Sequence, residues 1–259
     1  MQRSAGELEA PAWRVRRELR RTLFPTTVEP EGVGSADAVS GRDLAAFWRR
    51  NLRPERMTAV VVGPVDREAV TDAFRDWPRL AQADGSSGRR DHALELPDPE
   101  VNLPWAGIGY MASGTDLAPP ALAARLIDQR LTGSGLRVAN AELWWADGRH
   151  ALIVIGSAPL GRSAGTLTQR LREAVAETAA TVDAVAISVP RRELRNGLLY
   201  QARTPAGLAG VIGDFHDRTG RPDGAIRFLE ALDRVSSGSV RRDLQSLLGG
   251  APVTVEITP

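Results

Sequence analysis

Histidines, cysteines and short catalytic motifs are the first places to look for chemistry in this 259-residue sequence. It has three histidines and no cysteine, which excludes disulfides, thiolate nucleophiles and cysteine-type zinc sites. His92 lies in a Gly/Ser-rich stretch, and His150 begins a predicted strand. His216 stands between Asp214 and Asp217, at spacings that do not converge on one side of a helix. We therefore expect His216 to be a surface residue rather than a metal ligand.

Nucleotide-binding and serine-hydrolase motifs are also absent from the sequence. No G-x-S-x-G, P-loop or G-x-G-x-x-G pattern occurs, and Gly207, Gly210 and Gly213 recur within a helical pattern that favours close packing. The net charge of +1 argues against nucleic acid or anionic lipid as the main partner. Without a long apolar run or a secretory signal, we expect no membrane partner and a cytoplasmic location.

A helix, an apolar strand and a second helix are predicted over residues 41–77. Apolar residues recur at helical spacing from Leu44 to Leu52, after Ser40 as a predicted N-cap. The continuous apolar run 57–62 predicts a strand buried on both faces. Asp66 is expected to cap the helix that follows.

The sequence of this stretch resembles the pitrilysin/insulysin family of zinc peptidases, which includes mitochondrial processing peptidase. The family pattern DL..F....Y.P..M...VVG.VD is matched here, with Leu52 in place of the tyrosine, by Asp43-Leu44, Phe47, Pro54, Met57, Val61-Val62-Gly63 and Val65-Asp66. An unrelated α/β domain with an amphipathic helix before a core strand is the alternative interpretation of the same residues.

Further elements are predicted on both sides of this stretch. A helix over 7–24 keeps Leu8, Val15, Leu19 and Leu23 on one side. Past a linker, strands are expected at 105–111, 143–145, 151–157 and 252–258, the middle two paired around Asp147-Gly148. Helices are expected at 117–131, 163–180, from Pro190 onward, and at 205–218, 222–233 and 239–248.

The end of the chain repeats the middle of it. Adding 196 takes Ser40 to Ser236, and it takes Met57, Ala59 and Val61 to Val253, Val255 and Ile257. A shift of 175 takes the segment 16–20 to 191–195, with the same letters RRELR. Taken together these matches favour a duplicated fold. The second copy begins near Glu100, so we expect about 76 residues of the first copy to have no counterpart here.

The predicted fold class is α/β (α+β), with two homologous pitrilysin-like domains whose mixed or antiparallel sheets are backed by helices. Residues 1–80 are expected to be the C-terminal part of a truncated first domain, 81–98 a linker, and 99–259 the second domain. The predicted hairpin near Asp147 argues against an all-parallel sheet.

The resemblance also implies a zinc site, because such peptidases bind zinc through an inverted H-x-x-E-H motif and a distant glutamate. The segment Trp13-Arg-Val-Arg-Arg-Glu18-Leu19 is similar to the family's VILREM helix and places Glu18 at that third-ligand position. The H-x-x-E-H segment is not in the sequence. One carboxylate cannot hold zinc. We therefore expect no cofactor and no activity on this chain alone, and zinc on a partner subunit.

A second functional pair follows from the resemblance. Family members contact the bound peptide through an arginine and, seven residues later, a tyrosine, within a sequence segment such as LREKRGLAY. Here Arg137 is followed seven residues on by Trp144, which keeps a flat ring and a donor but lacks the hydroxyl. The alternative is that Arg137 is a solvated helix end and that Trp144 and Trp145 are core residues of a strand.

The sequence thus favours a non-catalytic, peptide-binding subunit that pairs with an H-x-x-E-H-bearing relative as a heterodimer. Two alternatives stay open: the C-terminal part of an active zinc peptidase whose start was assigned too far downstream, and a structural scaffold subunit without a peptide site.

Overall fold

The computed structural model describes residues 10–24, 40–51, 57–76, 93–99, 101–112, 116–146, 149–159 and 161–259, without the side chains of 47–51 and 146. The described helices are α2 (Pro11–Leu23), α3 (Gly41–Asn51), α4 (Arg67–Ala73), α5 (Ala118–Thr132), α6 (Ala164–Thr181), α7 (Ser188–Gln201), α8 (Pro205–Thr219), α9 (Gly224–Arg234) and α10 (Ser237–Leu248). The described strands are β1 (Ala93–Pro97), β2 (Trp105–Ala112), β3 (Val138–Ala146), β4 (Arg149–Ser157) and β5 (Val253–Thr258).

The described strands form one five-stranded mixed sheet in the order β1-β5-β2-β4-β3. The short edge strand β1 runs parallel to β5, and every other pair is antiparallel. At the other edge, β3 pairs with β4 from Val138↔Ser157 to Ala146↔Arg149. The mixed α/β fold predicted from the sequence is confirmed, because a parallel and several antiparallel pairs share one sheet backed by helices.

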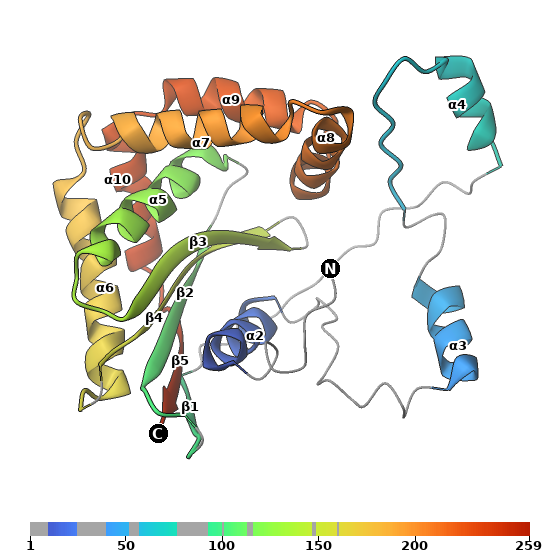
Figure 1. Cartoon of the computed structure of the whole chain (residues 1–259). Coiled ribbons are helices and arrows are strands. Elements are labelled where there is room, and N and C mark those ends of the chain that lie inside the picture. The colour runs from blue at the N-terminus through green and yellow to red at the C-terminus, as the bar shows by residue number, and fades with distance from the viewer. Residues whose placement is uncertain are drawn as a thin grey trace.

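The larger core lies between the sheet and a layer of helices that includes α5, α6 and α10 (Figure 1). Successive strand residues point to opposite faces, so Ile108, Leu152 and Val154 face this helical layer. Ser163 caps α6 and Ser236 caps α10, each through its side-chain oxygen. Each cap thus fixes the residue at which its helix begins.

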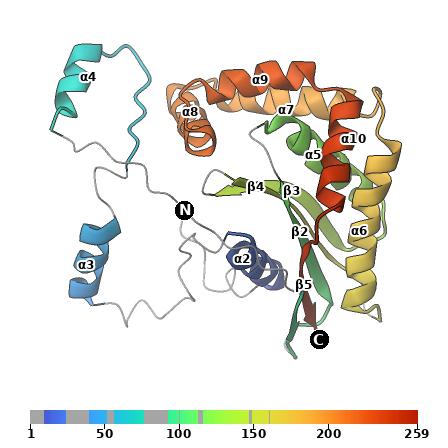
Figure 2. The same cartoon turned by 180° about the vertical axis from the view of Figure 1, so that it is seen from behind.

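The opposite face of the sheet is covered by α2 (Figure 2). Val15, Leu19 and Leu23 recur at helical spacing and are buried against β2, β4 and β5. The helix can approach because β2 carries glycine where it passes. A Cβ on Gly107 would collide with Val15 and lie 2.7 Å from Leu19 Cδ1, and one on Gly109 would lie 2.5 Å from Leu23 Cδ1. Helix α2 is therefore an integral layer of this sheet.

The predicted linker over 81–98 is wrong for residues 93–97, which form β1. Leu94 and Leu96 alternate with exposed neighbours and pack toward the α2 face, while Pro97 ends the strand at the edge, where its missing N–H matters least. The rest of that segment lies outside the described residues, as does the predicted turn at Asp147-Gly148. The assignment of 1–80 and 99–259 to two domains stays a prediction.

Predicted elements at 40–77 are only partly present. Ser40 and Asp43 cap α3 reciprocally, and Asp66 caps α4 by accepting from the N–H of Glu68. The predicted strand at 57–62 is wrong for the described structure, in which these residues form an extended segment without strand pairing. Met57 is 51% and Val61 46% exposed, because no described strand or helix buries both faces of the segment.

Most remaining predictions match the observed helices and strands within a few residues. The largest difference is β3, which was expected only at 143–145 and extends from Val138 to Ala146. The polar residues Asn140 and Glu142 obscured the alternation of apolar residues, because β3 is an edge strand.

Candidate functional site

Glu18 lies on α2, beside the residues that anchor this helix to the sheet. Its side chain is only 13% exposed, and both of its oxygens face arginines of the same helix. Arg17 Nε donates to Oε1 at 3.0 Å, and Arg21 lies 3.7 Å from Oε2. A metal ion at Glu18 would have to compete with these two guanidinium groups. The residues around Glu18 therefore do not fit a zinc site.

The other predicted metal-type residues do not gather either. Within the described ranges, no group of three His, Asp or Glu side chains is placed to hold a metal ion. His150 is buried at the start of β4 and His216 is half-buried on α8. His92 lies outside the described residues.

Arg137 is exposed and immediately precedes β3. Its backbone N–H donates to the carbonyl of Ser157 at 3.0 Å, which fixes the start of the β3–β4 pair. The guanidinium group is thus presented at one end of an edge strand.

Trp144 lies near the other end of β3 and is half-buried against the cluster on the α2 face. Trp145 points to the opposite face, where the Arg218 guanidinium stacks on its ring and also pairs with Asp214. Burial lowers the pKa of Arg218, and Asp214 opposes that shift. This stack ties α8 to the tip of β3.

The structure does not bring Arg137 and Trp144 into contact. Seven residues of extended chain span about 23 Å at about 3.3 Å per residue. The two residues instead mark the two ends of one edge strand. A ligand that contacts both must span most of the length of β3.

Two further contacts along this strand were not predicted from the sequence. Arg16 of α2 donates to Glu142 Oε1 at 2.6 Å, so a charged pair lies on the α2 face between the two ends. At the edge itself, the N–H of Ala141 donates to Asp128 Oδ1 of α5 at 3.2 Å. The period-two spacing of Asn140, Glu142 and Trp144 was the signal that could have indicated this face.

Two polar side chains, His150 of β4 and Asp243 of α10, lie where the sheet meets the helical layer. His150 is 2% exposed, and neither its Nε2 nor Asp243 Oδ2 has a hydrogen-bond partner among the described residues. Burial lowers the pKa of His150, against the charge of nearby Asp116. Burial, followed by Asp116, raises the pKa of Asp243 to about 6. The folded protein therefore disfavours charge on both His150 and Asp243.

Asp243→Asn should stabilise the protein at about pH 7.5 and change little at about pH 3.5, below the unfolded pKa of an aspartate. Because the pKa of Asp243 is raised from 3.8 to about 6 on folding, the cost in stability builds up as the pH rises between these two values, is fully present above about pH 6, and disappears only below the unfolded pKa. Allowing for solvent screening of a half-buried group, we expect about 1 kcal/mol, or about 3 °C in Tm at pH 7.5. Melting curves at both pH values, with Asp233→Asn as an exposed control, test this. An equal gain at both values would contradict it.

Comparison with known proteins places this fold in a family. The model of the peptidase M16 inactive domain matches residues 38–196, which is more than half of the chain. The chain belongs to the M16 peptidase family. The pitrilysin-like resemblance predicted from the sequence is confirmed, and the matching domain is the one described as inactive. None of the curated protein sequences matches the chain.

Solved structures of M16 and related proteins share the fold at low sequence identity. A protease from Helicobacter pylori is 13% identical with a TM-score of 0.76, over 98% of this chain and 70% of its own. The M16 inactive domain from Pseudomonas fluorescens is 15% identical with a TM-score of 0.70, over 96% of this chain and 66% of its own. A chain of complex III2 from Candida albicans is 9% identical with a TM-score of 0.67, over 98% and 70%. These likenesses concern the fold alone.

The chain thus matches the M16 domain of the inactive type, and its described strands form a mixed sheet. None of its described helices is long and apolar enough to span a membrane.

Proposed function

We propose that this M16 chain is the peptide-binding, non-catalytic subunit of a two-chain zinc peptidase, in which an H-x-x-E-H-bearing relative holds the metal. The match of residues 38–196 to the inactive domain carries the proposal. The pairing of Glu18 with Arg17 and Arg21 supports it, since this carboxylate is already neutralised by its own helix. We keep the cytoplasm as the proposed location.

Peptide contact is assigned in this proposal to Arg137 and Trp144, at the two ends of β3. An extended peptide of about seven residues matches their separation of about 23 Å. The exposed guanidinium of Arg137 would donate hydrogen bonds to a carbonyl or carboxylate of the peptide. The indole of Trp144 would offer a flat apolar surface. Both contacts would position a substrate rather than react with it.

The test is to measure zinc content and peptide turnover for this chain, for an H-x-x-E-H-bearing relative from the same genome, and for their mixture. We expect no turnover from this chain alone, because it lacks a metal-bound water and a general base. The mixture should exceed the sum of its parts. Zinc-dependent turnover by this chain alone would refute the proposal.

Arg137→Ala and Trp144→Ala should each lower kcat/KM of the mixture by about tenfold to a hundredfold, because substrate positioning is lost. Zinc on the partner should be unchanged. Arg162→Ala removes another exposed arginine from the same chain and serves as the matched control. Trp144→Phe controls for packing, because it retains an apolar ring. If the turnover of the mixture is the same with both alanine variants as with the unchanged chain, the assignment of peptide contact to Arg137 and Trp144 is wrong.

A scaffold role is the second candidate. It is favoured by the similarity to a chain of complex III2 and by the packing of Trp144 into the α2-face cluster. The turnover of the two-chain mixture distinguishes the two roles. A scaffold would associate with its partner, but the turnover would not depend on Arg137 or Trp144.

A further inference from the structure

Most of the large apolar side chains that are exposed in the described part of residues 93–259 lie on one helix. Four of them belong to α7 and the turn before it, and two lie elsewhere. The four are Val185, Val189, Leu199 and Tyr200, and the other two are Val138 and Ile226. An exposed apolar surface gathered on one element marks an interaction site.

Two of these residues lie on a stripe along α7. The stripe consists of Val189, Glu193, Asn196 and Tyr200, which are four, three and four residues apart, the spacing of residues that line one side of a helix. All four are exposed, Val189 by 44% and Tyr200 by 62%. On the opposite side of α7, Leu194 packs against the larger core. The stripe therefore faces away from the protein's own core.

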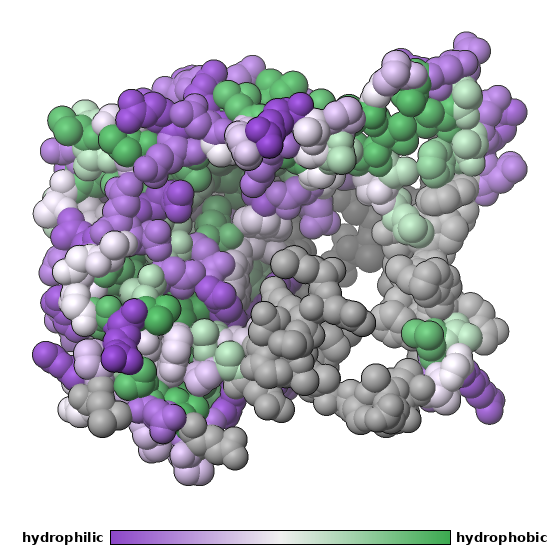
Figure 3. Space-filling model, viewed as in Figure 1, coloured by the Kyte–Doolittle hydropathy of each residue, from purple (hydrophilic) through white to green (hydrophobic). Residues whose placement is uncertain are grey.

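Helix α7 is fixed beside α9 on the outside of the helical layer (Figure 1 and Figure 2). Arg195 donates to Asp233 Oδ2 at 2.7 Å, and Arg191 donates to the carbonyl of Val235. These contacts make the two helices antiparallel and leave the stripe of α7 exposed. Along this row of helices, Figure 3 shows hydrophobic residues near each end and hydrophilic residues among them.

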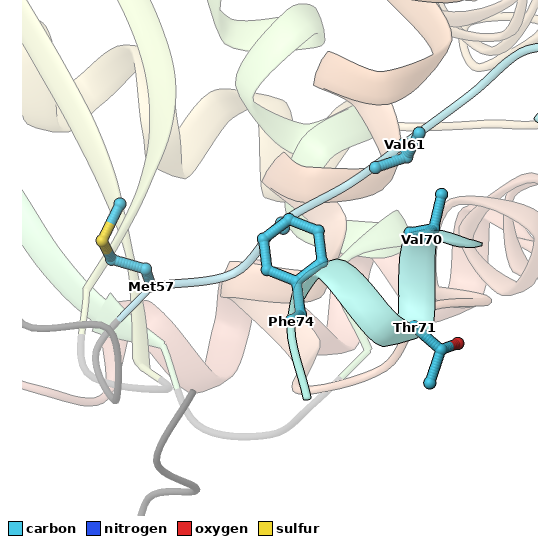
Figure 4. A pocket seen from close by; sticks show the side chains of 6 residues that line it. Met57, Val61, Val70, Thr71 and Phe74 are labelled. Atoms are coloured by element: carbon cyan, nitrogen blue, oxygen red, sulfur yellow. The ribbon is translucent and has the colours of Figure 1, made fainter. Parts of the chain in front are cut away.

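A second group of exposed apolar side chains lies beside α4. Met57 and Val61 line a hollow together with Val70, Thr71 and Phe74 (Figure 4). Apart from Thr71 the side chains of this lining are apolar, so they do not select one particular partner. The stripe on α7 differs, because its middle is polar.

The middle of the stripe is complementary to itself when two copies of α7 run antiparallel. A twofold axis halfway between Glu193 and Asn196 brings Glu193 opposite Asn196 of the second copy. It also brings Val189 opposite Tyr200. The Asn196 amide can then donate to the Glu193 carboxylate, and symmetry makes this contact twice. Arg125 lies 3.9 Å from Oε2 of Glu193, which leaves Oε1 to accept. A parallel pair would instead place Glu193 against Glu193, and like charges repel.

Gly197 lies beside the stripe and gives a second helix room to approach. No described atom lies within 4 Å of where a Cβ on Gly197 would be. A glycine inside a helix destabilises it relative to alanine, and packing within the described chain does not require one here. Close approach of a second helix accounts for this glycine.

We propose that α7 binds a second copy of this chain in an antiparallel helix pair. Contacts of Val189 with Tyr200 would bury apolar surface at both ends, and contacts of Glu193 with Asn196 would fix the register. Each copy contributes one helix, so the contact is small, and we expect a dissociation constant on the order of 10 μM. The inference does not rest on the proposed function, and its surface is distinct from β3.

Sedimentation of the full chain over a range of concentrations tests the proposal. We expect a monomer at about 1 μM and mostly a dimer at about 100 μM. Asn196→Asp should weaken association by about tenfold or more, because it gathers carboxylates of both copies at the twofold axis. Asn102→Asp makes the same change at an exposed residue before β2 and should have no effect. Both variants should keep the Tm of the unchanged chain.

Single cysteines can report the register, because the chain contains none. When Val189→Cys and Tyr200→Cys chains are mixed and mildly oxidised, we expect a crosslinked dimer. Each variant alone should crosslink about tenfold less, because equal positions in the antiparallel pair lie about 16 Å apart along the helix axis, too far for a disulfide.

A chain that stays monomeric at about 100 μM would overturn the proposal. Crosslinking of Val189→Cys chains with themselves as readily as with Tyr200→Cys chains would exclude the antiparallel pair and overturn it as well. If the chain is monomeric alone and associates only with an H-x-x-E-H-bearing relative, and Asn196→Asp prevents this, the relative is the occupant of α7 and self-association is wrong.

Discussion

A fragment of residues 99–259, the second domain predicted from the sequence, should fail to fold cooperatively. It lacks α2 and β1, so Val253, Val255 and Ile257 lose their cover on one face. Burial of a large apolar side chain contributes about 1.5–3 kcal/mol, and α2 and its C-cap bury Val15, Leu19, Leu23 and Phe24. The sum of about 8 kcal/mol is comparable to the whole stability of an ordinary domain.

Thermal melting and dye binding to exposed apolar surface test this expectation. The fragment should show no sharp transition and should bind the dye, as a chain without fixed tertiary packing does. The fragment 10–259 retains every described element and should melt like the whole chain. A sharp, cooperative transition for 99–259 would show that α2 is dispensable and would support the domain boundary at residue 98.

Gly107→Val should lower the free energy of unfolding by about 3 kcal/mol, near the upper end for overpacking. At Gly107 a Cβ already collides with Val15 and approaches Leu19, so a branched side chain must displace α2. For a chain of this size we expect Tm to fall by about 10 °C. Chemical denaturation gives the energy directly. Gly133→Ala is the matched control, because nothing lies within 4 Å of a Cβ there.

The direction of the effect can be checked by compensation. In a Gly107→Ala background, Val15→Ala should recover part of the lost stability, because it removes the Cγ1 that the new Cβ meets. Additive losses in this double-mutant cycle would indicate that the glycine is required for a reason other than its contact with α2.

Local patterns predicted those features that depend on neighbouring residues. Serine and aspartate caps, proline in first turns and helical spacing placed most helices, and the β3–β4 pairing followed from two apolar runs around a turn signal. The packing of α2 on the sheet depends on distant residues and was not predicted. Sequence spacing showed that Val15, Leu19 and Leu23 share a face, but not that this face packs on β2, about 90 residues away.

The same limit explains the strand predicted at 57–62. Its apolar run is that of a buried strand, yet burial requires neighbours, and none is described beside it. The candidate site was predicted as a pair of residues from a resemblance. Its geometry as the two ends of an edge strand, with Arg16 and Glu142 between them, required the fold.

The docking of α2 onto the sheet amounts to an intramolecular binding reaction. Sixty-eight residues separate Phe24 from Ala93, so the helix and the sheet it covers are joined by a long tether. The entropic cost of closing a loop rises slowly with its length, by about 0.6 kcal/mol for each doubling. Changes in tether length should therefore have little effect on docking. A single chain break anywhere in the tether would instead make docking depend on protein concentration, and dilution would release the helix.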